Sequence, residues 1–154
     1  MKVLFLDFDG VLNSESWYKY EDRRKVKGGA TLSPLACSNL QYILDQDAGI
    51  KLVISSTWRK NNNLAGLRNI LTAYGVNGSK VLGVTPSVIS GDRAQEINLW
   101  LEANPNVTKF VILDDDQDVL AVKDPRGHTF ITTPEDGLLY KQAKAIAKLF
   151  RGEK

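Results

Sequence analysis

The stretch LFLDFDGVLN (residues 4–13) places Asp7 and Asp9 directly after an apolar run and follows them with Gly10. A short apolar run bounded by turn residues predicts a buried strand, so both carboxylates would lie at its carboxyl end. Each carboxylate disfavours ionisation of the other unless a cation lies between them. The stretch therefore predicts a strand that ends at a polar site, where a metal ion would relieve the repulsion.

Length and composition are those of one ordinary globular domain. The chain has 154 residues, of which 43% are hydrophobic and 25% charged, and its net charge of +2 is too small to indicate general nucleic-acid binding. Cys37 is the only cysteine, so no intramolecular disulfide is expected. The N-terminus reaches Asp7 too early for a signal peptide, and no apolar stretch approaches the ~20 residues of a membrane span. We therefore expect a cytoplasmic protein.

Short apolar runs alternate with segments of helical period, the pattern of α/β proteins with a mainly parallel sheet. The expected strands are Val3 to Leu6, Lys51 to Ser55, Val81 to Val84, Lys109 to Leu113 and His128 to Thr132. We expect residues 1–154 to form a single doubly wound, Rossmann-like α/β domain with about five strands. The distances between the polar motifs are too short for a large folded insertion, so no cap domain is expected.

Four helices are expected between and after these strands. The first begins with Ser33 as its N-cap and Pro34 at the first helical position, and it ends at Gly49. A weaker second helix covers Leu64 to Ala73, and the third ends before Pro105. The side chains expected to be buried are Ala36, Leu40, Ile43 and Leu44 in the first helix, Ala94, Ile97, Trp100 and Leu101 in the third, and Leu139, Ala143, Ile146, Ala147 and Phe150 in the last. Cys37, on the first helix, is also expected in the core.

The segment from Asn13 to Thr31 does not fit this alternation. Its notable residues are the aromatic Trp17, Tyr18 and Tyr20, the basic Arg23, Arg24, Lys25 and Lys27, and the paired Gly28 and Gly29. A loop of this length inside a compact domain is usually functional or disordered. We expect a flap beside the site, with a solvated flap whose charges only maintain solubility as an equal alternative.

Polar residues follow three of the expected strands. They are Asp7 and Asp9 after the first strand, Ser55, Ser56, Thr57, Trp58 and Arg59 at the end of the second, and Asp114, Asp115, Asp116 and Asp118 after the fourth. Ligands of open α/β sheets bind outside the carboxyl ends of the strands, so these groups should converge if the strands are parallel. Carboxylate oxygens suit Mg²⁺, which predicts a magnesium site at this edge.

These motifs resemble those of the haloacid dehalogenase (HAD) superfamily of phosphohydrolases. LFLDFDGV is similar to the first motif of the family, KLVISS to the second, Arg93 in GDRAQEINLWL to the third, and FVILDDDQD to the fourth. The motifs occur in the family's order and span residues 4–118. The stretches ISSTWR, RAQEINLWL and the late GLL turn resemble the small cap-less branch found in RNA-repair (Swiss Army Knife) and viral proteins.

The resemblance implies a Mg²⁺-dependent phosphatase that hydrolyses phosphate monoesters. Asp7 would be the nucleophile that forms an aspartyl-phosphate, and Asp9 would protonate the leaving oxygen and then activate water. Arg93 and a serine hydroxyl would hold the transferring oxygens. The expected metal ligands are Asp7, Asp9 through its backbone carbonyl, Asp114 and Asp115. The serine stays open: strand length favours Ser55, whereas the spacing to the Trp-Arg pair favours Ser56.

Each assignment has a structural alternative. Asp7 and Asp9 could be turn residues, and the serines an ordinary end to a strand. Arg93 could be a surface residue paired with Glu96 or Glu102 across helical turns. Some of Asp115, Asp116 and Asp118 could be acids that favour a helix start. Trp58 and Arg59 could brace the second motif or touch substrate, and His128 is expected to be a strand residue rather than a catalyst.

Three classes of function fit these motifs. We favour the phosphomonoesterase over a phosphoacceptor signalling domain, in which the phosphorylated aspartate ends a middle strand, and over a catalytically silent HAD-like binding module. A nucleotide or a nucleic-acid end is the expected substrate, because a cap-less site is open and the flap combines aromatic rings with cations. The alternative is a small-molecule (sugar or metabolite) phosphatase whose flap acts as a lid.

Overall fold

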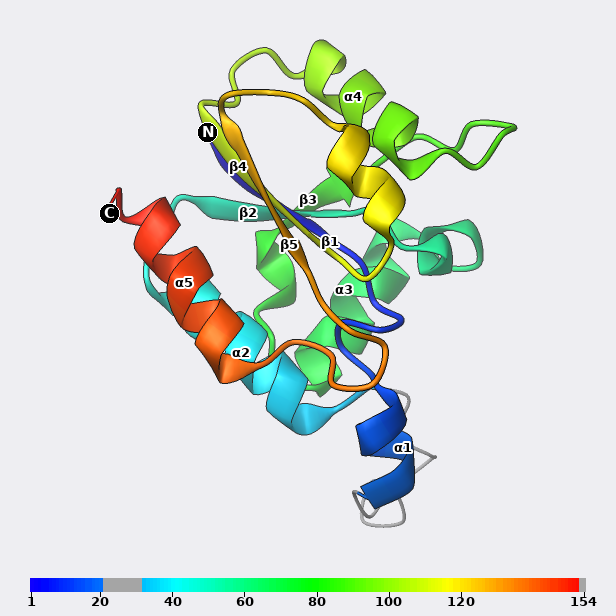
Figure 1. Ribbon diagram of the computed structural model, residues 1–154, viewed down its shortest axis with the longest axis vertical. Helices are drawn as coiled ribbons and strands as arrows, with labels where there is room; N and C mark the ends of the chain where they lie inside the picture. Colours follow the sequence, from blue (N-terminus) through cyan, green and yellow to red (C-terminus); the bar gives the residue numbers. More distant parts are fainter. Residues whose placement is uncertain (21–31, 153–154) are drawn as a thin grey trace.

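All five apolar runs form strands of one parallel sheet. The structure, a computed structural model, describes residues 1–20, without the side chain of Tyr20, and residues 32–152. The strands are β1 (Lys2–Leu6), β2 (Ile50–Ile54), β3 (Val81–Val84), β4 (Lys109–Asp114) and β5 (Gly127–Ile131). They pair in the order β3-β2-β1-β4-β5 (Figure 1). The expected Rossmann-like α/β fold is confirmed, and the described residues contain no second compact domain.

The helices follow the expected segments closely. They are α1 (Glu15–Tyr20), α2 (Pro34–Asp45), α3 (Leu64–Ala73), α4 (Arg93–Ala103) and α5 (Tyr140–Phe150), with short 3₁₀ helices η2 (Thr57–Lys60), η3 (Gly78–Lys80) and η4 (Gln117–Ala121). The Ser33 hydroxyl caps α2 by accepting from the amide of Ala36 at 3.2 Å. Leu139 is wrongly expected in the core: it precedes α5 and is 46% exposed, because the buried stripe of that helix begins at Ala143.

The strands are apolar on both faces because helices cover both faces (Figure 1). One core lies under α2, α3 and α5, and its strand residues include Leu4, Leu6, Leu52, Ile54, Val111 and Leu113. The opposite core lies under α4 and η4, and its strand residues are Val3, Phe5, Val53, Phe110 and Ile112. Cys37 is fully buried in the first core, as expected.

The strand order reverses between β1 and β4. The chain runs outward from β1 to β2 and β3, and then returns to place β4 on the other side of β1. Leu6 lies opposite Leu113, so the residues that follow them, Asp7 and Asp114, meet at this switch point. Open α/β sheets bind ligands at such a point. The order also differs from the 2-1-3-4-5 arrangement of flavodoxin-like signalling folds, which argues against the phosphoacceptor alternative.

The segment from Asn13 to Thr31 begins with a helix instead of a loop. The expectation of a loop is wrong for residues 15–20, which form α1. Trp17 on this helix is only 3% exposed, so its ring is not available to stack on a base. The expectation that the aromatic rings of the flap contact a substrate is wrong for this residue. The basic cluster and paired glycines expected in the flap, Arg23, Arg24, Lys25, Lys27, Gly28 and Gly29, lie outside the described residues.

The longest described helix, α2, has 12 residues. No helix in the described part of the chain is therefore long and apolar enough to cross a membrane.

Candidate active site

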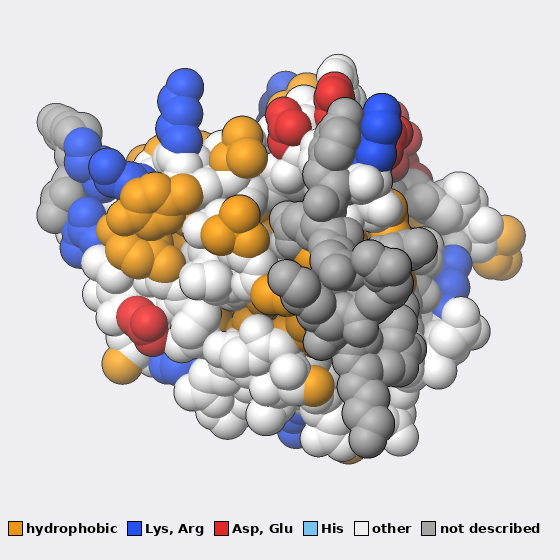
Figure 2. Space-filling view, turned by 90° about the horizontal axis from the view of Figure 1, so that it is seen from below, with side chains coloured by type: hydrophobic (Ala, Val, Ile, Leu, Met, Phe, Trp, Pro, Cys, Tyr) orange, Lys and Arg blue, Asp and Glu red, His pale blue; other side chains and the backbone are white. Residues whose placement is uncertain are grey.

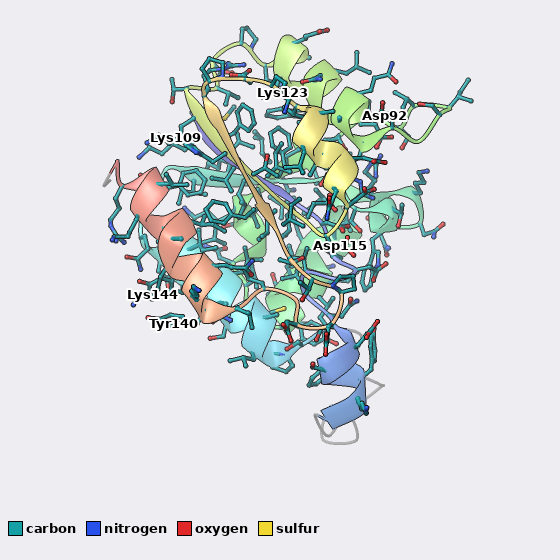
Figure 3. All side chains as sticks on the ribbon, viewed as in Figure 1. Asp92, Lys109, Asp115, Lys123, Tyr140 and Lys144 are labelled. Carbon is teal, nitrogen blue, oxygen red and sulfur yellow. The ribbon has the colours of Figure 1, made fainter. Side chains whose placement is uncertain are left out.

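Three carboxylates meet at the carboxyl edge of the sheet. Asp7 follows β1, Asp114 ends β4 and Asp115 comes next, and one oxygen from each lies within 4.8 Å of the others. Asp115 and Lys109 mark the opposite ends of β4 in Figure 3. Asp7 and Asp114 are buried, with exposures of 4% and 0%. Parallel pairing of β1 and β4 therefore brings together three of the acids expected in the site.

Arg93 lies between two of these acids. Its Nη1 is 2.8 Å from Asp114 Oδ2 and 3.1 Å from Asp7 Oδ1. Arg93 is the first residue of α4, and Asp92 caps that helix by accepting from two of its amides. Burial disfavours the charged guanidinium, but Asp114 and Asp7 outweigh this effect and raise the pKa of Arg93 above its ordinary value. Its expected alternative, pairing with Glu96 or Glu102 on the surface, is wrong.

One arginine leaves the acid cluster with excess negative charge. Burial, followed by repulsion from Asp114, raises the pKa of Asp7 to about 8 despite the opposing effect of Arg93. Burial likewise raises the pKa of Asp115. A divalent cation fits this set, because its charge would replace the proton and its hardness matches carboxylate oxygens. Asp7, Asp114 and Asp115 are the residues that could hold it.

The raised pKa of Asp7 predicts an unusual dependence of stability on pH. An unfolded aspartate loses its proton near pH ~3.9, whereas folded Asp7 keeps its proton up to about pH 8. The free energy of unfolding of the metal-free protein should therefore fall as pH rises between these values. In chelator at pH 8, Asp7→Asn should melt above the wild type, whereas at pH 4 the two should melt together.

Thermal melts across this pH range, with and without Mg²⁺, measure the effect. Mg²⁺ should raise the melting temperature of the wild type at pH 8 more than that of Asp7→Asn. Two results would contradict the assignment of this pH dependence to Asp7. One is a wild-type melting temperature that rises with pH in chelator. The other is a melting temperature at pH 8 that the substitution leaves unchanged.

The Asp9 side chain lies apart from the three-carboxylate cluster. Asn13 Nδ2 donates to Asp9 Oδ1 at 2.8 Å, and Trp58 Nε1 donates to Asp9 Oδ2 at 3.1 Å. The Trp58 ring packs edge-on against Phe8, with ring centroids 4.9 Å apart. Asp9 itself remains exposed. Two donors thus hold the carboxylate at the mouth of the site. The sequence did not indicate that Asn13 would be one of them.

The turn that follows Asp7 and includes Asp9 depends on Gly10. This glycine has φ of +80°, and a side chain at this position would collide with the carboxylate of Asp115. The Thr132 hydroxyl donates to the Gly10 carbonyl at 2.7 Å. The Leu138 amide donates to the Val11 carbonyl at 2.8 Å. The loop after β5 therefore braces the turn that carries both aspartates.

Ser55 and Ser56 are both fully buried but have different contacts. The Ser56 hydroxyl caps η2 by accepting from the amide of Trp58 at 3.2 Å. The Ser55 amide continues the sheet by donating to the carbonyl of Leu6 at 2.9 Å. The Ser55 hydroxyl has no hydrogen-bond partner among the described residues. A buried hydroxyl without a partner is costly, which is typical of a group that a ligand satisfies.

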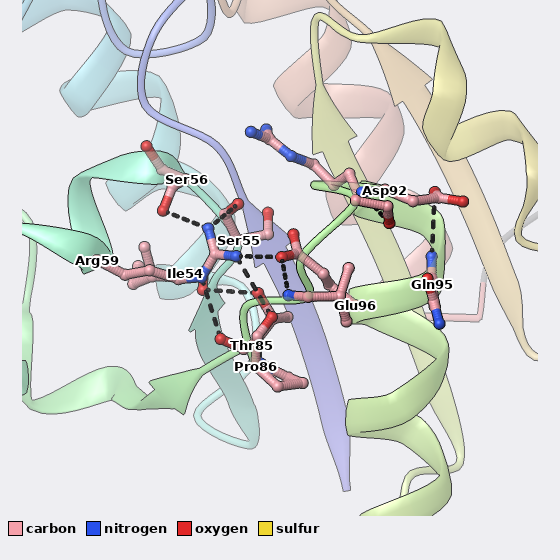
Figure 4. Close-up of polar contacts among 12 residues, drawn as sticks. Ile54, Ser55, Ser56, Arg59, Thr85, Pro86, Asp92, Gln95 and Glu96 are labelled. Carbon is pink, nitrogen blue, oxygen red and sulfur yellow. Dashed lines mark hydrogen bonds and ion pairs between the residues drawn. The ribbon is translucent and has the colours of Figure 1, made fainter.

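Arg59 joins three elements behind these serines (Figure 4). Its Nη1 donates to the carbonyls of Ser55 at 3.1 Å and Ser56 at 2.8 Å. Its Nε donates to the carbonyl of Thr85, just after β3, at 3.0 Å. Its Nη2 pairs with Glu96 of α4 at 2.8 Å, and both side chains are at most 4% exposed. Of the two expectations for Arg59, bracing is therefore the one that the contacts support.

Glu96 completes this connection from α4. One of its carboxylate oxygens pairs with Arg59 and also accepts from the amide of Val88 at 3.0 Å. Glu96 lies one helical turn after Arg93, on the same helix. The ion pair therefore links the backbone of the serines to the helix that carries the site's cation, a role for Glu96 that the sequence did not indicate.

The remaining candidates lie outside the acid cluster. Asp116 caps η4 by accepting from the amide of Asp118, and its own amide donates to Asp114 Oδ1, both at 2.9 Å. Asp116 is therefore structural. Asp118 is exposed on η4, and His128 is an exposed residue of β5, as expected.

A family model matches residues 3–143 of the chain, and its description is "HAD domain in Swiss Army Knife RNA repair proteins". Comparison with curated proteins and with solved structures found no significant match. The match covers all five strands except Lys2, the first residue of β1, and it covers every residue of the site described above. The chain therefore belongs to the family of HAD domains of Swiss Army Knife RNA repair proteins.

Proposed function

We propose that the protein is a Mg²⁺-dependent phosphatase that hydrolyses phosphate monoesters through an aspartyl-phosphate on Asp7. The observation that carries the proposal is the pairing of Asp7 and Asp114 with Arg93 at the switch point, beside Asp115. A phosphate ester has anionic oxygens that need cations and a phosphorus atom that needs a nucleophile. This edge of the sheet offers both, together with a second carboxylate held separately at Asp9.

The proposed reaction has two displacements at phosphorus. In the first, a carboxylate oxygen of Asp7 bonds to phosphorus, the bond to the ester oxygen breaks, and protonated Asp9 gives its proton to that oxygen. In the second, Asp9 takes a proton from water as the water oxygen bonds to phosphorus. The bond from phosphorus to Asp7 then breaks, which releases inorganic phosphate and restores both aspartates.

The other groups would position the phosphoryl group. We assign the serine of the second motif to Ser55, because its buried hydroxyl lacks a partner among the described residues whereas that of Ser56 caps η2. Arg93 would hold phosphoryl oxygens with its guanidinium, where electrostatic positioning does most of the work. Asp7, Asp114 and Asp115, with the backbone carbonyl of Asp9, would hold Mg²⁺, which when bound supplies charge neutralisation for those oxygens.

A nucleotide or a nucleic-acid end is the proposed substrate class. The family description names RNA repair, and the described residues include no second domain that would close over the site. The cations of the flap, which were expected to pair with phosphates, lie outside the described residues. A sugar or metabolite phosphatase is the alternative, and a substrate screen separates the two.

The first experiment measures hydrolysis of p-nitrophenyl phosphate and of a nucleoside monophosphate. Turnover should require Mg²⁺ and stop in chelator. Asp9→Asn should lower kcat/KM for the nucleoside monophosphate by ~10²–10⁴-fold, because its alkoxide leaving group needs a proton, and by less for p-nitrophenyl phosphate, whose p-nitrophenolate leaves without one. Asp118→Asn, on exposed η4, is the matched control and should behave as the wild type. Full turnover in chelator, or equal losses of kcat/KM on both substrates, would contradict the proposal.

A further inference from the structure

A hollow of about 590 Å³ lies beside Asp9. Its lining residues are Asp9, Thr57, Trp58, Lys60, Asn61 and Asn62. All except Asp9 come from η2 and the two residues that follow it. One short segment of the chain therefore forms almost the whole wall of a hollow that borders the proposed acid.

The chemistry of the proposed function indicates what would occupy this hollow. Asp9 must reach the ester oxygen that leaves phosphorus, so the rest of the leaving alcohol has to lie next to the Asp9 carboxylate. Attack by Asp7 comes from the opposite side of the phosphorus in an in-line displacement. The hollow that Asp9 borders is thus on the side where the leaving group emerges. This inference rests on the proposed function.

The wall of the hollow is held in place before any ligand binds. Trp58 is fixed by its contact with Phe8 and by its bond to Asp9. The side-chain amide of Asn62 donates to the Trp58 carbonyl at 3.0 Å, and the Asn61 amide donates to the same carbonyl at 3.3 Å. Arg59, buried behind the segment, anchors η2 to α4. A preorganised wall lowers the cost of ordering on binding.

The lining groups have a defined chemistry. Among the described residues that line it, Lys60 is the one cation, Thr57 offers a hydroxyl, and Asn61 offers a carboxamide. A hollow of about 570 Å³ near the start of α4 is lined instead by Asp92 and Asp118, with no cation among its described lining residues, so those residues are unsuited to an anion. Among the described residues on the face in Figure 2, Lys and Arg side chains are scattered over the surface. In the described part of the chain, Lys60 is therefore the side chain of this hollow that could pair with an anion beside Asp9.

We propose that this hollow binds the leaving alcohol of the substrate and that Lys60 pairs with a second anionic group on it. Thr57 and Asn61 would hydrogen-bond to the alcohol's polar edges. Within the proposed substrate class, an alcohol that carries both hydrogen-bonding groups and a second negative charge is a nucleotide that continues into a phosphodiester. The preferred substrate is then the phosphorylated end of an oligonucleotide rather than a mononucleotide.

The test compares three substrates that differ in the leaving group. They are p-nitrophenyl phosphate, a nucleoside monophosphate and dinucleotides with a phosphate at the 5′ or 3′ end. Lys60→Gln should lower kcat/KM for a dinucleotide by about 3–10-fold more than for the other two substrates. It should also reduce the slope of log(kcat/KM) against log salt by ~0.7, the value for one phosphate contact on a single strand. Lys60→Arg should restore most of the loss.

Lys148→Gln is the matched control, because this exposed lysine lies in the last turn of α5. Lys2 donates to the carbonyl of Phe150, which places that end of α5 at the start of β1, away from the site. Equal losses on all three substrates, or no loss with Lys60→Gln on either dinucleotide, would overturn the proposal. If the wild type hydrolyses none of the three substrates, the proposed function itself would be overturned. Anisotropy of a labelled dinucleotide on Asp7→Asn gives an independent readout, in which unchanged affinity after adding Lys60→Gln also counts against the pairing.

Discussion

Asp7→Asn is expected to lower kcat for p-nitrophenyl phosphate by about 10⁴–10⁶-fold while the protein stays folded, as for loss of the nucleophile in other covalent enzymes. Asparagine has nearly the shape of aspartate, but its amide is a poor nucleophile and carries no charge. The buried position of Asp7, 3.1 Å from Arg93, leaves no space for gross rearrangement. The loss should therefore come from the chemical step and not from unfolding.

The measurement requires Mg²⁺ well above the amount that saturates the wild type, since Asp7 is also a proposed ligand. Circular dichroism and thermal melting of the same preparations establish that the variant is folded. Asp118→Asn again serves as the control and should keep wild-type kcat. Near-normal turnover by folded Asp7→Asn would contradict Asp7 as the nucleophile.

Arg59→Met should have the largest effect on stability, with a loss of about 3–5 kcal/mol in the free energy of unfolding. The substitution leaves the buried Glu96 carboxylate without its cation. It also removes the donors to the carbonyls of Ser55 and Ser56. Because a small displacement of a positioning group can cost ~10²-fold in rate, kcat should fall by about that factor at temperatures where the variant is folded. Chemical denaturation and steady-state kinetics measure the two effects.

Two further variants separate positioning from general stability. Arg68→Met is the matched control, because Arg68 also donates to a backbone carbonyl, that of Val81, at 2.7 Å, but at the amino end of β3, the opposite edge of the sheet from the acids. It should lose less stability and keep kcat. The double variant Arg59→Met with Glu96→Met removes both buried charges and should recover much of the stability but not the rate. Full recovery of kcat with stability would show that Arg59 has no positioning role.

The fold was predictable because its signals are local. Each strand is a short apolar run. Ser33, whose hydroxyl can cap a helix, and Pro34, which is favoured at the first helical position, together indicate the start of α2. The helix α1 was not predictable in the same way, because it has only six residues and follows a turn set by Gly10, although the Ser14 hydroxyl caps it by accepting from the amide of Trp17 at 3.0 Å. The exposure of Leu139 depends on where the first turn of α5 meets α2, which sequence periodicity does not specify.

The acids of the site were predictable for a topological reason. Asp7 and Asp114 follow apolar runs, and parallel strands end at the same edge of a sheet. The ion pair of Arg59 with Glu96 was not predictable, because it joins residues of different elements whose distance depends on how α4 packs on the sheet. The same holds for Asn13, whose bond to Asp9 depends on a local turn. The different contacts of Ser55 and Ser56 likewise depend on where β2 ends and η2 begins, which the sequence does not specify to the residue.

Direct detection of phosphorylated Asp7 tests the central claim most directly. Asp9→Asn incubated with p-nitrophenyl phosphate and Mg²⁺ should accumulate the intermediate, because p-nitrophenolate leaves without a proton whereas the attacking water lacks its base. Acid quenching and peptide mass spectrometry should then find one added phosphoryl group on the peptide that contains Asp7. The group should be lost in hydroxylamine and absent from samples with chelator. Turnover without any label, or a label on Ser55, Ser56 or another residue, would contradict an aspartyl-phosphate at Asp7.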